Sequence, residues 1–532
     1  MVCCAMAPTR TFVASWSAVM CKSVGSFVTK RAYLNPAQEA AVEFERGRRL
    51  TFLELNSRIN RLANGLASRG VCKGDRLAIL LPNSLEYVET YFASAKIGAV
   101  VVPLNWRLVP DELEFILRDS GSSVLVYGSA FDGNANALKQ RDTSVCTWIR
   151  VSDGESHLSS AQDYDEILQQ ASESEPGITA RGDDLLLLVY TSGTTGFPKG
   201  AMLTHDNMLW ACITWNVTCD MRAGDRHLIV LPLFHLGGLF PLTAAFHRGQ
   251  TAVILRSAEP QHLLRSIERE KVTVGVIVTT ILRLILQTLE DKTYNCTTLR
   301  WVVAGGEAVP AELILRAAGL GIEILQDYGL TETCGIATII SSEDAVKKAG
   351  SSGKPYFHTE VRVVADDGRD VSPGEVGEVI VRGPHAMKGY WNRAKATAET
   401  IREGWLYTGD LATIDHDGCI YIRDRRKDMI ISGGENIYPA EIERVLQLHS
   451  KIREVAVIGQ HSAKWGESPA AIVVVKEGAS LSTEEVLSHC RSRLAGFKLP
   501  QCIEIVSELP RTPTGKVQKH VLRERFPGPA PQ

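Results

Sequence analysis

Helical segments alternate with short strands rich in valine and isoleucine along most of this chain. In residues 53–66, leucine and isoleucine recur at helical spacing, and a glycine turn and an apolar strand at 76–81 follow. The same order of helix and strand returns at 85–105 and at 257–278. Since parallel strands need long crossover connections, usually helices, this alternation predicts an α/β fold with helix-covered parallel sheets.

The pattern changes after residue 360, where two strand runs surround turn residues at 360–383 and predict a small β-rich subdomain. Further on, a helix that begins at Pro439 is followed by strands and another helix, which predicts a smaller C-terminal α+β domain. Because 532 residues exceed one compact core, we expect several domains. The predicted division is an extension at 1–22, an N-terminal domain at 23–426 and a mobile C-terminal domain at 427–532.

Composition limits the classes of partner. A net charge of −3 gives no general attraction for nucleic acid or anionic lipid. No apolar run reaches the ~18 residues that a membrane-spanning helix needs. The twelve cysteines are scattered without a C-x-x-C pair, which favours a reducing compartment, here the cytoplasm, over a zinc site or disulfide framework. Residues 1–38 contain basic but no acidic side chains, so the N-terminus is either an organellar transit peptide or weak secretory signal, or a disordered extension.

The segment from Leu185 to His205 carries the strongest local signal for ligand binding. An apolar strand runs into hydroxyl and glycine residues followed by a lysine, namely Thr191, Ser192, Gly193, Thr194, Thr195, Gly196 and Lys199. Glycines let backbone N–H groups face an anion, hydroxyls add donors and the lysine adds positive charge, so the segment predicts a polyphosphate-binding loop. It lacks the G-x-x-x-x-G-K-[ST] pattern of P-loop NTPases.

Two other predicted strands end in polar residues: Gly305, Gly306 and Glu307 on one, and Gln326, Asp327, Tyr328, Gly329, Thr331 and Glu332 on the other. An aromatic ring can stack on a base, and a carboxylate can hold Mg²⁺. Because ligands usually bind at the carboxyl ends of the strands in an α/β sheet, we expect the three loops to converge at one sheet edge. From the sequence alone, His235 in its apolar run is expected to be a packed or capping residue. Lys516 is expected to be a solvent-exposed lysine.

Five segments in this order resemble the adenylate-forming superfamily of acyl- and aryl-CoA synthetases, luciferases and nonribosomal peptide adenylation domains. They are YTSGTTGFPKG at 190–200, QDYGLTE at 326–332, YTGD at 407–410, the stretch at 423–436 and PRTPTGK at 510–516. The segments at 423–443 and 456–474 look most like bacterial long-chain fatty-acyl-CoA synthetases.

The resemblance implies a reaction in two steps. ATP and a carboxylic acid give an acyl-adenylate and pyrophosphate, and the thiol of coenzyme A then displaces AMP to form a thioester. ATP, Mg²⁺ and coenzyme A are the implied ligands. A carboxylate is a poor electrophile, so AMP supplies the leaving group, and a cation has to bridge the two anions as they approach.

The resemblance also implies roles for single residues. Lys516 is the bridging cation, and the implied catalytic set is Lys516, Lys199, Thr331 and Glu332. The loop from Thr191 to Lys199 holds the β- and γ-phosphates, Thr331 contacts the α-phosphate and Glu332 binds Mg²⁺. Adenine is flanked by 305–307 and 326–328, and Gly329 belongs to the implied nucleotide-binding set. The implied acyl pocket contains His235, Gly305 and Gly335.

A rotation of the C-terminal domain between the two half-reactions is a further implication of the resemblance. Lys427 matches the hinge, and Asp410 and Arg425 match residues that grip the ribose hydroxyls. The segment that approaches the pantetheine arm of coenzyme A corresponds to Ser432, Gly433 and Gly434.

The leading hypothesis is an ATP-dependent ligase for a medium- to long-chain fatty acid. The alternatives are a ligase for aryl or alicyclic acids, an enzyme that loads a carrier protein, and a nucleotide-binding scaffold without catalysis. The joint presence of Lys516, Glu332 and Asp410 argues against the scaffold. Peripheral membrane contact and a homodimer stay open.

Overall fold

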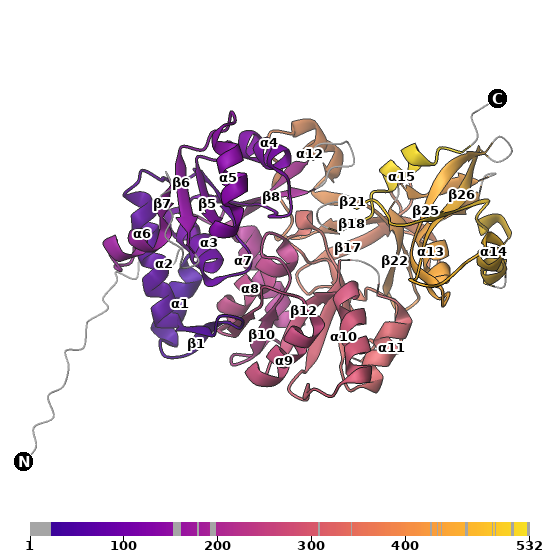
Figure 1. Cartoon of the computed structure of the whole chain (residues 1–532), viewed down its shortest axis with the longest axis horizontal. Helices are drawn as coiled ribbons and strands as arrows, with labels where there is room; N and C mark the ends of the chain where they lie inside the picture. The colour runs from indigo at the N-terminus through magenta and orange to yellow at the C-terminus, as the bar shows by residue number, and fades with distance from the viewer. Residues whose placement is uncertain are drawn as a thin grey trace, which may run out of the picture.

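The structure is a computed structural model that describes residues 23–532 apart from 153–160, 178–179, 192–197, 307–308, 342, 426–427, 433–434, 438, 463–465, 492, 495, 512–514 and 529–532. A large N-terminal part contains two sheets covered by helices, and a smaller C-terminal part lies at one end of the molecule (Figure 1). This arrangement confirms the predicted α/β fold class with a smaller C-terminal domain.

The first large sheet has eight strands in the order β19-β9-β8-β4-β3-β5-β6-β7. Its parallel strands are β3 (Arg76–Leu80), β4 (Val100–Pro103), β5 (Val124–Gly128), β6 (Thr147–Val151), β7 (Gln162–Asp163) and β8 (Leu185–Thr191). At one edge lie two antiparallel strands, β9 (Lys199–Thr204) and β19 (Gly389–Tyr390). The accompanying helices are α2 (Phe52–Ala67), α3 (Leu85–Ile97), α4 (Pro110–Ser120), α5 (Asp132–Lys139) and α6 (Tyr164–Gln170).

The second large sheet has nine strands in the order β16-β15-β14-β13-β12-β10-β11-β1-β2. Six of them are parallel: β1 (Glu39–Glu43), β10 (Arg226–Ile229), β11 (Thr251–Ile254), β12 (Val274–Val278), β13 (Trp301–Gly305) and β14 (Ile324–Tyr328). The antiparallel strands are β2 (Arg48–Thr51), β15 (Thr338–Ile339) and β16 (Lys354–Pro355). Its helices are α1 (Ser26–Leu34), α7 (His205–Thr218), α8 (Leu236–Arg248), α9 (Pro260–Glu270), α10 (Thr279–Asp291) and α11 (Ala311–Gly319).

The β-rich subdomain predicted after residue 360 is confirmed as an antiparallel sheet. It contains β17 (Glu360–Val364), β18 (Val376–Arg382), β20 (Ile401–Arg402), β21 (Trp405–Ile414) and β22 (Ile420–Arg425). Helix α12 (Ala394–Thr400) lies between β19 and β20 in the chain.

The C-terminal part has a sheet of its own, made of β23 (Ile430–Ser432), β24 (Glu435–Ile437), β25 (Ile452–Ser462), β26 (Gly466–Val475) and β27 (Cys502–Val506). Its helices are α13 (Pro439–Gln447), α14 (Thr483–Arg491) and α15 (Lys519–Arg525). The helix predicted to begin at Pro439 is confirmed. The predicted domain boundary at 426/427 lies outside the described residues.

The sequence of α2 shows why its helix forms where it does. Thr51 caps the first turn and Glu54 bonds back to it, which satisfies backbone donors that the helix cannot pair. Leu55, Ile59 and Leu66 are fully buried, as their spacing predicts. Leu53, which opened the predicted stripe, is instead 53% exposed, because a spacing of two residues turns it away from that face.

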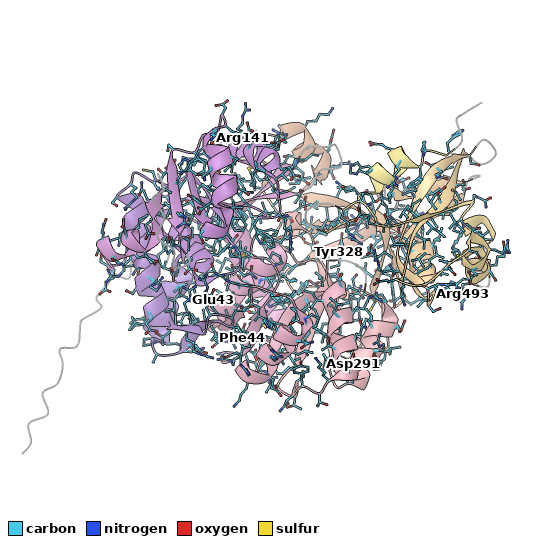
Figure 2. All side chains as sticks on the ribbon, viewed as in Figure 1. Glu43, Phe44, Arg141, Asp291, Tyr328 and Arg493 are labelled. Atoms are coloured by element: carbon cyan, nitrogen blue, oxygen red, sulfur yellow. The ribbon has the colours of Figure 1, made fainter. Side chains whose placement is uncertain are left out.

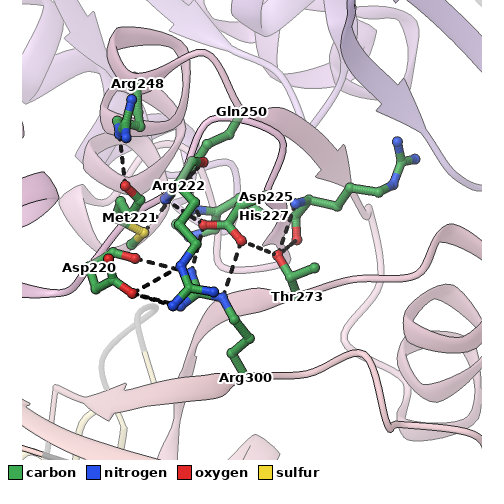
Figure 3. Close-up of polar contacts among 10 residues, drawn as sticks. Asp220, Met221, Arg222, Asp225, His227, Arg248, Gln250, Thr273 and Arg300 are labelled. Atoms are coloured by element: carbon green, nitrogen blue, oxygen red, sulfur yellow. Dashed lines mark hydrogen bonds and ion pairs between the residues drawn. The ribbon is translucent and has the colours of Figure 1, made fainter.

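A buried polar network holds the amino ends of four parallel strands of the nine-stranded sheet together (Figure 3). Asp225, Gln250, Thr273 and Arg300 each directly precede one strand, β10, β11, β12 and β13. The carboxylate of Asp225 is 5% exposed and accepts hydrogen bonds from Arg300 Nη2 at 2.7 Å and Thr273 Oγ1 at 2.9 Å. Gln250 Nε2 adds a third bond at 3.3 Å. The network ties four strand starts to one buried carboxylate.

Within the described part of the chain, no helix is both long and apolar enough to cross a bilayer.

Candidate functional site

The residues predicted to bind ligands lie at the ends of strands from two sheets. Thr191 ends β8 in the eight-stranded sheet, whereas Gly305 and Tyr328 end β13 and β14 in the nine-stranded sheet. The expectation that all three loops share one sheet edge is therefore wrong. The two sheets meet at this point because β9 contacts the 3₁₀ helix Thr331–Thr333, which follows β14.

β8 and β9 form an antiparallel hairpin in which Thr191 stands opposite Lys199. The side chain of Lys199 lies over the ring of Tyr390, with Nζ 5.5 Å from the ring centre, as in a cation–π contact. The hairpin thus places the predicted phosphate-binding lysine at the base of the connecting loop. Outside the described residues lie the predicted loop residues Ser192, Gly193, Thr194, Thr195 and Gly196.

Tyr390 connects the two sheets and was not found by sequence reasoning. Its backbone pairs β19 with β9, and its hydroxyl donates to Glu332 Oε1 at 2.7 Å. Burial, and then the neighbouring carboxylate of Glu332, raise the pKa of Tyr390, so the phenol keeps its proton. Lys199, Tyr390 and Glu332 therefore form one contiguous group. A lone tyrosine in a short strand has no local sequence signal for this role.

The ends of β13 and β14 place a tyrosine beside the β-rich subdomain. Tyr328 donates from its hydroxyl to Asp410 Oδ2 at 2.7 Å, and it lies near the middle of the molecule (Figure 2). Gly306 has a φ of +82°, a left-handed conformation that favours glycine at this turn. Gln326 is 3% exposed, and Glu307 lies outside the described residues.

The pair predicted to grip a ribose is aligned by strand register. Asp410 on β21 stands directly opposite Arg425 on β22, and Asp410 is 5% exposed. With Tyr328 bonded to Asp410, the end of β14 is linked to this pair. The predicted hinge residue, Lys427, lies outside the described residues.

A tight turn that follows Thr331 and Glu332 brings Gly335 against helix α8. After the 3₁₀ helix, Gly335 has a φ of +93°, and a Cβ added there would lie 3.5 Å from the ring of Phe240 on α8. Gly329 packs directly against the Gly335 backbone, where a Cβ would lie 2.2 Å from the carbonyl oxygen. The glycines therefore allow the turn to close against α8.

His235 precedes α8 in the N-cap position, but its side chain makes no capping hydrogen bond. Its ring lies 4.5 Å from that of Phe234. Burial, and then the positive charges of Lys516 and Arg107, lower the pKa of His235 to about 4. The imidazole is therefore neutral at pH 7.

Lys516 lies close enough to His235 to act on it electrostatically, although Lys516 belongs to the C-terminal part and His235 precedes α8 in the large part. Its side chain is exposed. The C-terminal part thus presents its predicted catalytic lysine to the ends of the strands in the large part. Ser432 is elsewhere on that part, buried at the turn between β23 and β24, and Gly433 and Gly434 lie outside the described residues.

The carboxylate of Glu332 is suited to bind a magnesium ion whose other ligands are mainly substrate phosphates. Among the described residues, no group of three or more His, Cys, Asp or Glu side chains gathers to bind a metal. One oxygen of Glu332 accepts from Tyr390, which leaves the second for an ion. Mg²⁺ commonly takes one or two carboxylates together with substrate phosphates, so Glu332 fits this role.

Comparisons with known proteins identify the family of this chain. The model of the AMP-binding enzyme family matches residues 28–391, and that of the AMP-binding enzyme C-terminal domain matches residues 441–516. The chain is 40% identical over 514 residues to the long-chain-fatty-acid–CoA ligase FadD13 of Mycobacterium tuberculosis (strain ATCC 25618 / H37Rv), covering 96% of this chain and 100% of the relative. It is also 40% identical over 506 residues to a feruloyl-CoA synthase of Amycolatopsis sp, covering 95% and 99%.

Among solved structures, o-succinylbenzoate CoA synthetase from Bacillus subtilis is similar over nearly the whole chain. In its complex with the acyl-adenylate intermediate it has a TM-score of 0.85 and 35% identity, covering 95% of this chain and 99% of that one. In its complex with ATP and a magnesium ion the TM-score is 0.84 at 35% identity, with 94% and 99% covered. The chain therefore belongs to the AMP-binding enzyme family, as an acid–CoA ligase of the adenylate-forming kind.

Proposed function

We propose that this protein activates a medium- to long-chain fatty acid with ATP, through an acyl-AMP intermediate, and transfers the acyl group to coenzyme A. The observation that carries the proposal is the position of Lys516. Its charge acts on His235, which directly precedes α8 in the large part. A lysine that the C-terminal part brings to the large part suits the bridging of two anions.

In the first half-reaction, Lys516 and Lys199 neutralise charge as the carboxylate approaches the α-phosphate, and Thr331 orients that phosphate. The pair of Asp410 and Arg425 holds the ribose, and Gln326 to Tyr328 with Gly305 to Glu307 flank the adenine. A magnesium ion on Glu332 would neutralise the phosphates. Tyr390 holds the Glu332 carboxylate in place through its 2.7 Å hydrogen bond.

For the second half-reaction, we propose that the C-terminal part rotates about Lys427. Rotation would withdraw Lys516 and bring the segment with Ser432, Gly433 and Gly434 to the pantetheine arm. A neutral His235 beside Gly335 and Gly305 lines the acyl-binding region in this proposal. The cysteines in the described part of the chain are free thiols, which supports a reducing compartment such as the cytoplasm.

Opposite effects of two substitutions test the rotation. Gly434→Leu should spare acyl-AMP formation and block thioester formation, because bulk would obstruct the pantetheine arm. Lys516→Ala should do the reverse with supplied acyl-AMP. Single-turnover assays of each half-reaction measure both effects. Equal damage to both half-reactions by both substitutions would contradict the proposal.

A ligase for aryl acids is the second candidate, because the feruloyl-CoA synthase is as similar to this chain as the fatty-acid ligase. Pyrophosphate release across fatty, aryl and alicyclic acids separates the two. Coenzyme A and an acyl-carrier protein are then compared as acceptors. Acyl-AMP formation without any CoA thioester would overturn the leading proposal.

A further inference from the structure

Helix α4 ends in a carboxylate at a place where a helix disfavours one. Asp119 is the last residue but one of α4 (Pro110–Ser120), and its side chain is only 12% exposed. A helix carries partial negative charge at its carboxyl end, and aspartate is a weak helix former, so Asp119 opposes the local preference. Such a conflict indicates that contacts outside the helix account for the residue.

The Asp119 carboxylate joins two segments that are far apart in the chain. One oxygen accepts a hydrogen bond from the Tyr190 hydroxyl on β8 at 2.7 Å, and the other accepts from Arg393 Nη2 at 2.7 Å. The backbone carbonyl of Asp119 accepts a third bond, from Trp391 Nε1 at 3.0 Å. Asp119 therefore ties the end of β8 to the residues that directly follow β19.

Strand β9 lies between these two segments, because the sheet order is β19-β9-β8. Gly200 of β9 stands opposite Tyr190, and its carbonyl oxygen accepts a hydrogen bond from the Trp391 backbone N–H at 2.8 Å. A Cβ added at Gly200 would lie 3.1 Å from the Tyr190 ring, so the ring packs closely over the glycine. Asp119 thus bridges across β9 and holds the two strands on either side of it.

Lys199 and Tyr390 lie on the other face of these strands, since successive side chains of a strand point to opposite faces of the sheet. Lys199 directly precedes Gly200 in β9. Tyr390 likewise precedes Trp391, whose ring bonds Asp119. On their own face the lysine and the tyrosine contact each other, next to the carboxylate predicted to hold magnesium. Asp119 therefore acts on them only through the backbone of their strands.

We propose that Asp119 is a positioning residue for Lys199 and Tyr390 in the binding of MgATP. It fixes the ends of β8, β9 and β19 relative to one another, so that the lysine and the tyrosine hydroxyl keep their places beside Glu332. The inference rests on the proposed roles of Lys199 and Glu332 with ATP and magnesium. It goes beyond them by naming a residue that touches no ligand.

The size of the effect follows from the distance at which Asp119 acts. Loss of a residue that orients a metal ligand commonly costs roughly 10- to 100-fold in metal affinity or activity. Asp119 acts one step further from the ion, so we expect a loss at the lower end, about tenfold in the affinity for MgATP. Thioester formation from acyl-AMP should not change, because the β- and γ-phosphates have left before that step.

The experiment compares Asp119→Ala and Asp119→Asn with the wild type. Calorimetric titration with MgATP, without acid, gives the dissociation constant. Pyrophosphate release gives KM for MgATP and for the acid that reacts fastest, and thioester formation from supplied acyl-AMP gives the rate of the second half-reaction. Asp111→Asn is the matched control, because it removes a carboxylate from the same helix whose side chain is 81% exposed.

A double-mutant cycle with Tyr190→Phe tests the route of the effect. Tyr190→Phe should weaken MgATP binding less than Asp119→Ala does, because the bond from Arg393 remains. In Asp119→Ala the tyrosine substitution should add little, because the hydroxyl has already lost its acceptor. Full additivity of the two substitutions would overturn the inference.

The expected result is a rise of about tenfold in both the dissociation constant and KM for MgATP in Asp119→Ala. The rise should be smaller in Asp119→Asn, which keeps one acceptor oxygen. KM for the acid, the second half-reaction and the control should stay as in the wild type.

Unchanged constants for MgATP in the folded Asp119 variants would overturn the inference. So would equal losses in both half-reactions, which a general loss of structure produces. Failure of both Asp119 variants to fold, together with normal MgATP binding by Tyr190→Phe, would assign Asp119 to stability alone. Failure of the wild type to release pyrophosphate with any acid would instead refute the proposed function.

Discussion

In the nine-stranded sheet, the carboxylate at the amino ends of the strands and the carboxylate at their carboxyl ends differ in their hydrogen-bond and charge partners. At the amino ends of the strands, Asp225 accepts hydrogen bonds from Gln250, Thr273 and Arg300, which directly precede β11, β12 and β13 (Figure 3). At the carboxyl edge, Asp327 has no cationic partner among the described residues, and burial raises its pKa to about 7. The amino ends pair their carboxylate with a cation within the fold, whereas Asp327 has the Tyr356 hydroxyl beside it and no cation among the described residues.

This difference indicates that the amino ends of the strands serve stability and the carboxyl ends serve ligand binding. Ligands of α/β sheets bind at the carboxyl ends of the strands, so polar groups there have to remain available. The amino edge has no such demand, and its polar groups can pair with one another. Substitutions at the amino edge should therefore cost stability, and those at the carboxyl edge should change activity.

The largest effect is expected for Lys516→Ala. Loss of the bridging cation should lower the rate of acyl-AMP formation about a thousandfold, as for other residues that stabilise charge in a transition state. The melting temperature should not change, because the side chain is exposed. Rapid-quench assays and calorimetry measure the two quantities. Lys476→Ala, which removes an exposed lysine from the same part of the chain, should leave both unchanged.

Asp225→Ala tests the opposite edge. We expect a loss of about 3 kcal/mol in the free energy of unfolding, because Arg300 and Thr273 lose their buried acceptor. Urea unfolding measures the loss, and activity of the folded fraction should be kept at low temperature. Asp220→Ala is the control, since that side chain is 69% exposed and its ion pairs contribute little. If Asp225→Ala kept the stability of the wild type but lost activity, the assignment of a purely structural role to the amino ends of the strands would be wrong.

Asp327→Asn should stabilise the protein, in contrast to Asp225→Ala. The pKa of Asp327 is raised by folding, so between pH 4 and 7 the folded chain holds more protons and its stability falls as pH rises. Tyr356 and Cys219, whose pKa values burial raises, keep their protons in this range. At pH 8 the gain should be about 2 kcal/mol, less than a full three-unit pKa change implies because Asp327 is partly solvated.

The gain for Asp327→Asn should shrink toward zero near pH 4, where the wild-type carboxyl is protonated in both states. Thermal unfolding from pH 4 to 8 measures it. A gain that does not depend on pH would show that Asp327 does not carry the cost of ionisation.

Tyr390→Phe should have the smallest effect. The ring keeps its contact with Lys199, but Glu332 loses one hydrogen bond, worth about 1 kcal/mol. Acyl-AMP formation should slow about fivefold, and more Mg²⁺ should be needed for half-maximal rate. Magnesium titrations of the pyrophosphate assay measure both. Tyr421→Phe, which removes a 3.4 Å bond to Asp415 away from these residues, should behave as the wild type.

Local sequence patterns predicted much of the fold but only part of the candidate site. The buried face of α2 and the helix start at Pro439 follow from spacing and capping, which act over a few residues. Tyr390 escaped prediction because its role depends on β19 pairing with β9 far along the chain. The prediction that all three loops lie at one edge of the same sheet was wrong, because the residue pattern of a strand does not reveal which sheet it joins.

By itself, the sequence determined which residue types stand at the strand ends: glycines that permit tight turns, a phosphate-suited hairpin, and carboxylates beside them. These depend on side-chain chemistry and on short-range geometry. Only the tertiary structure decided that Lys516 lies within electrostatic reach of His235, that Tyr390 joins Lys199 to Glu332, and that Asp327 lies against Gly305. Contacts between residues far apart in the chain arise from the packing of whole sheets and helices, which no local pattern specifies.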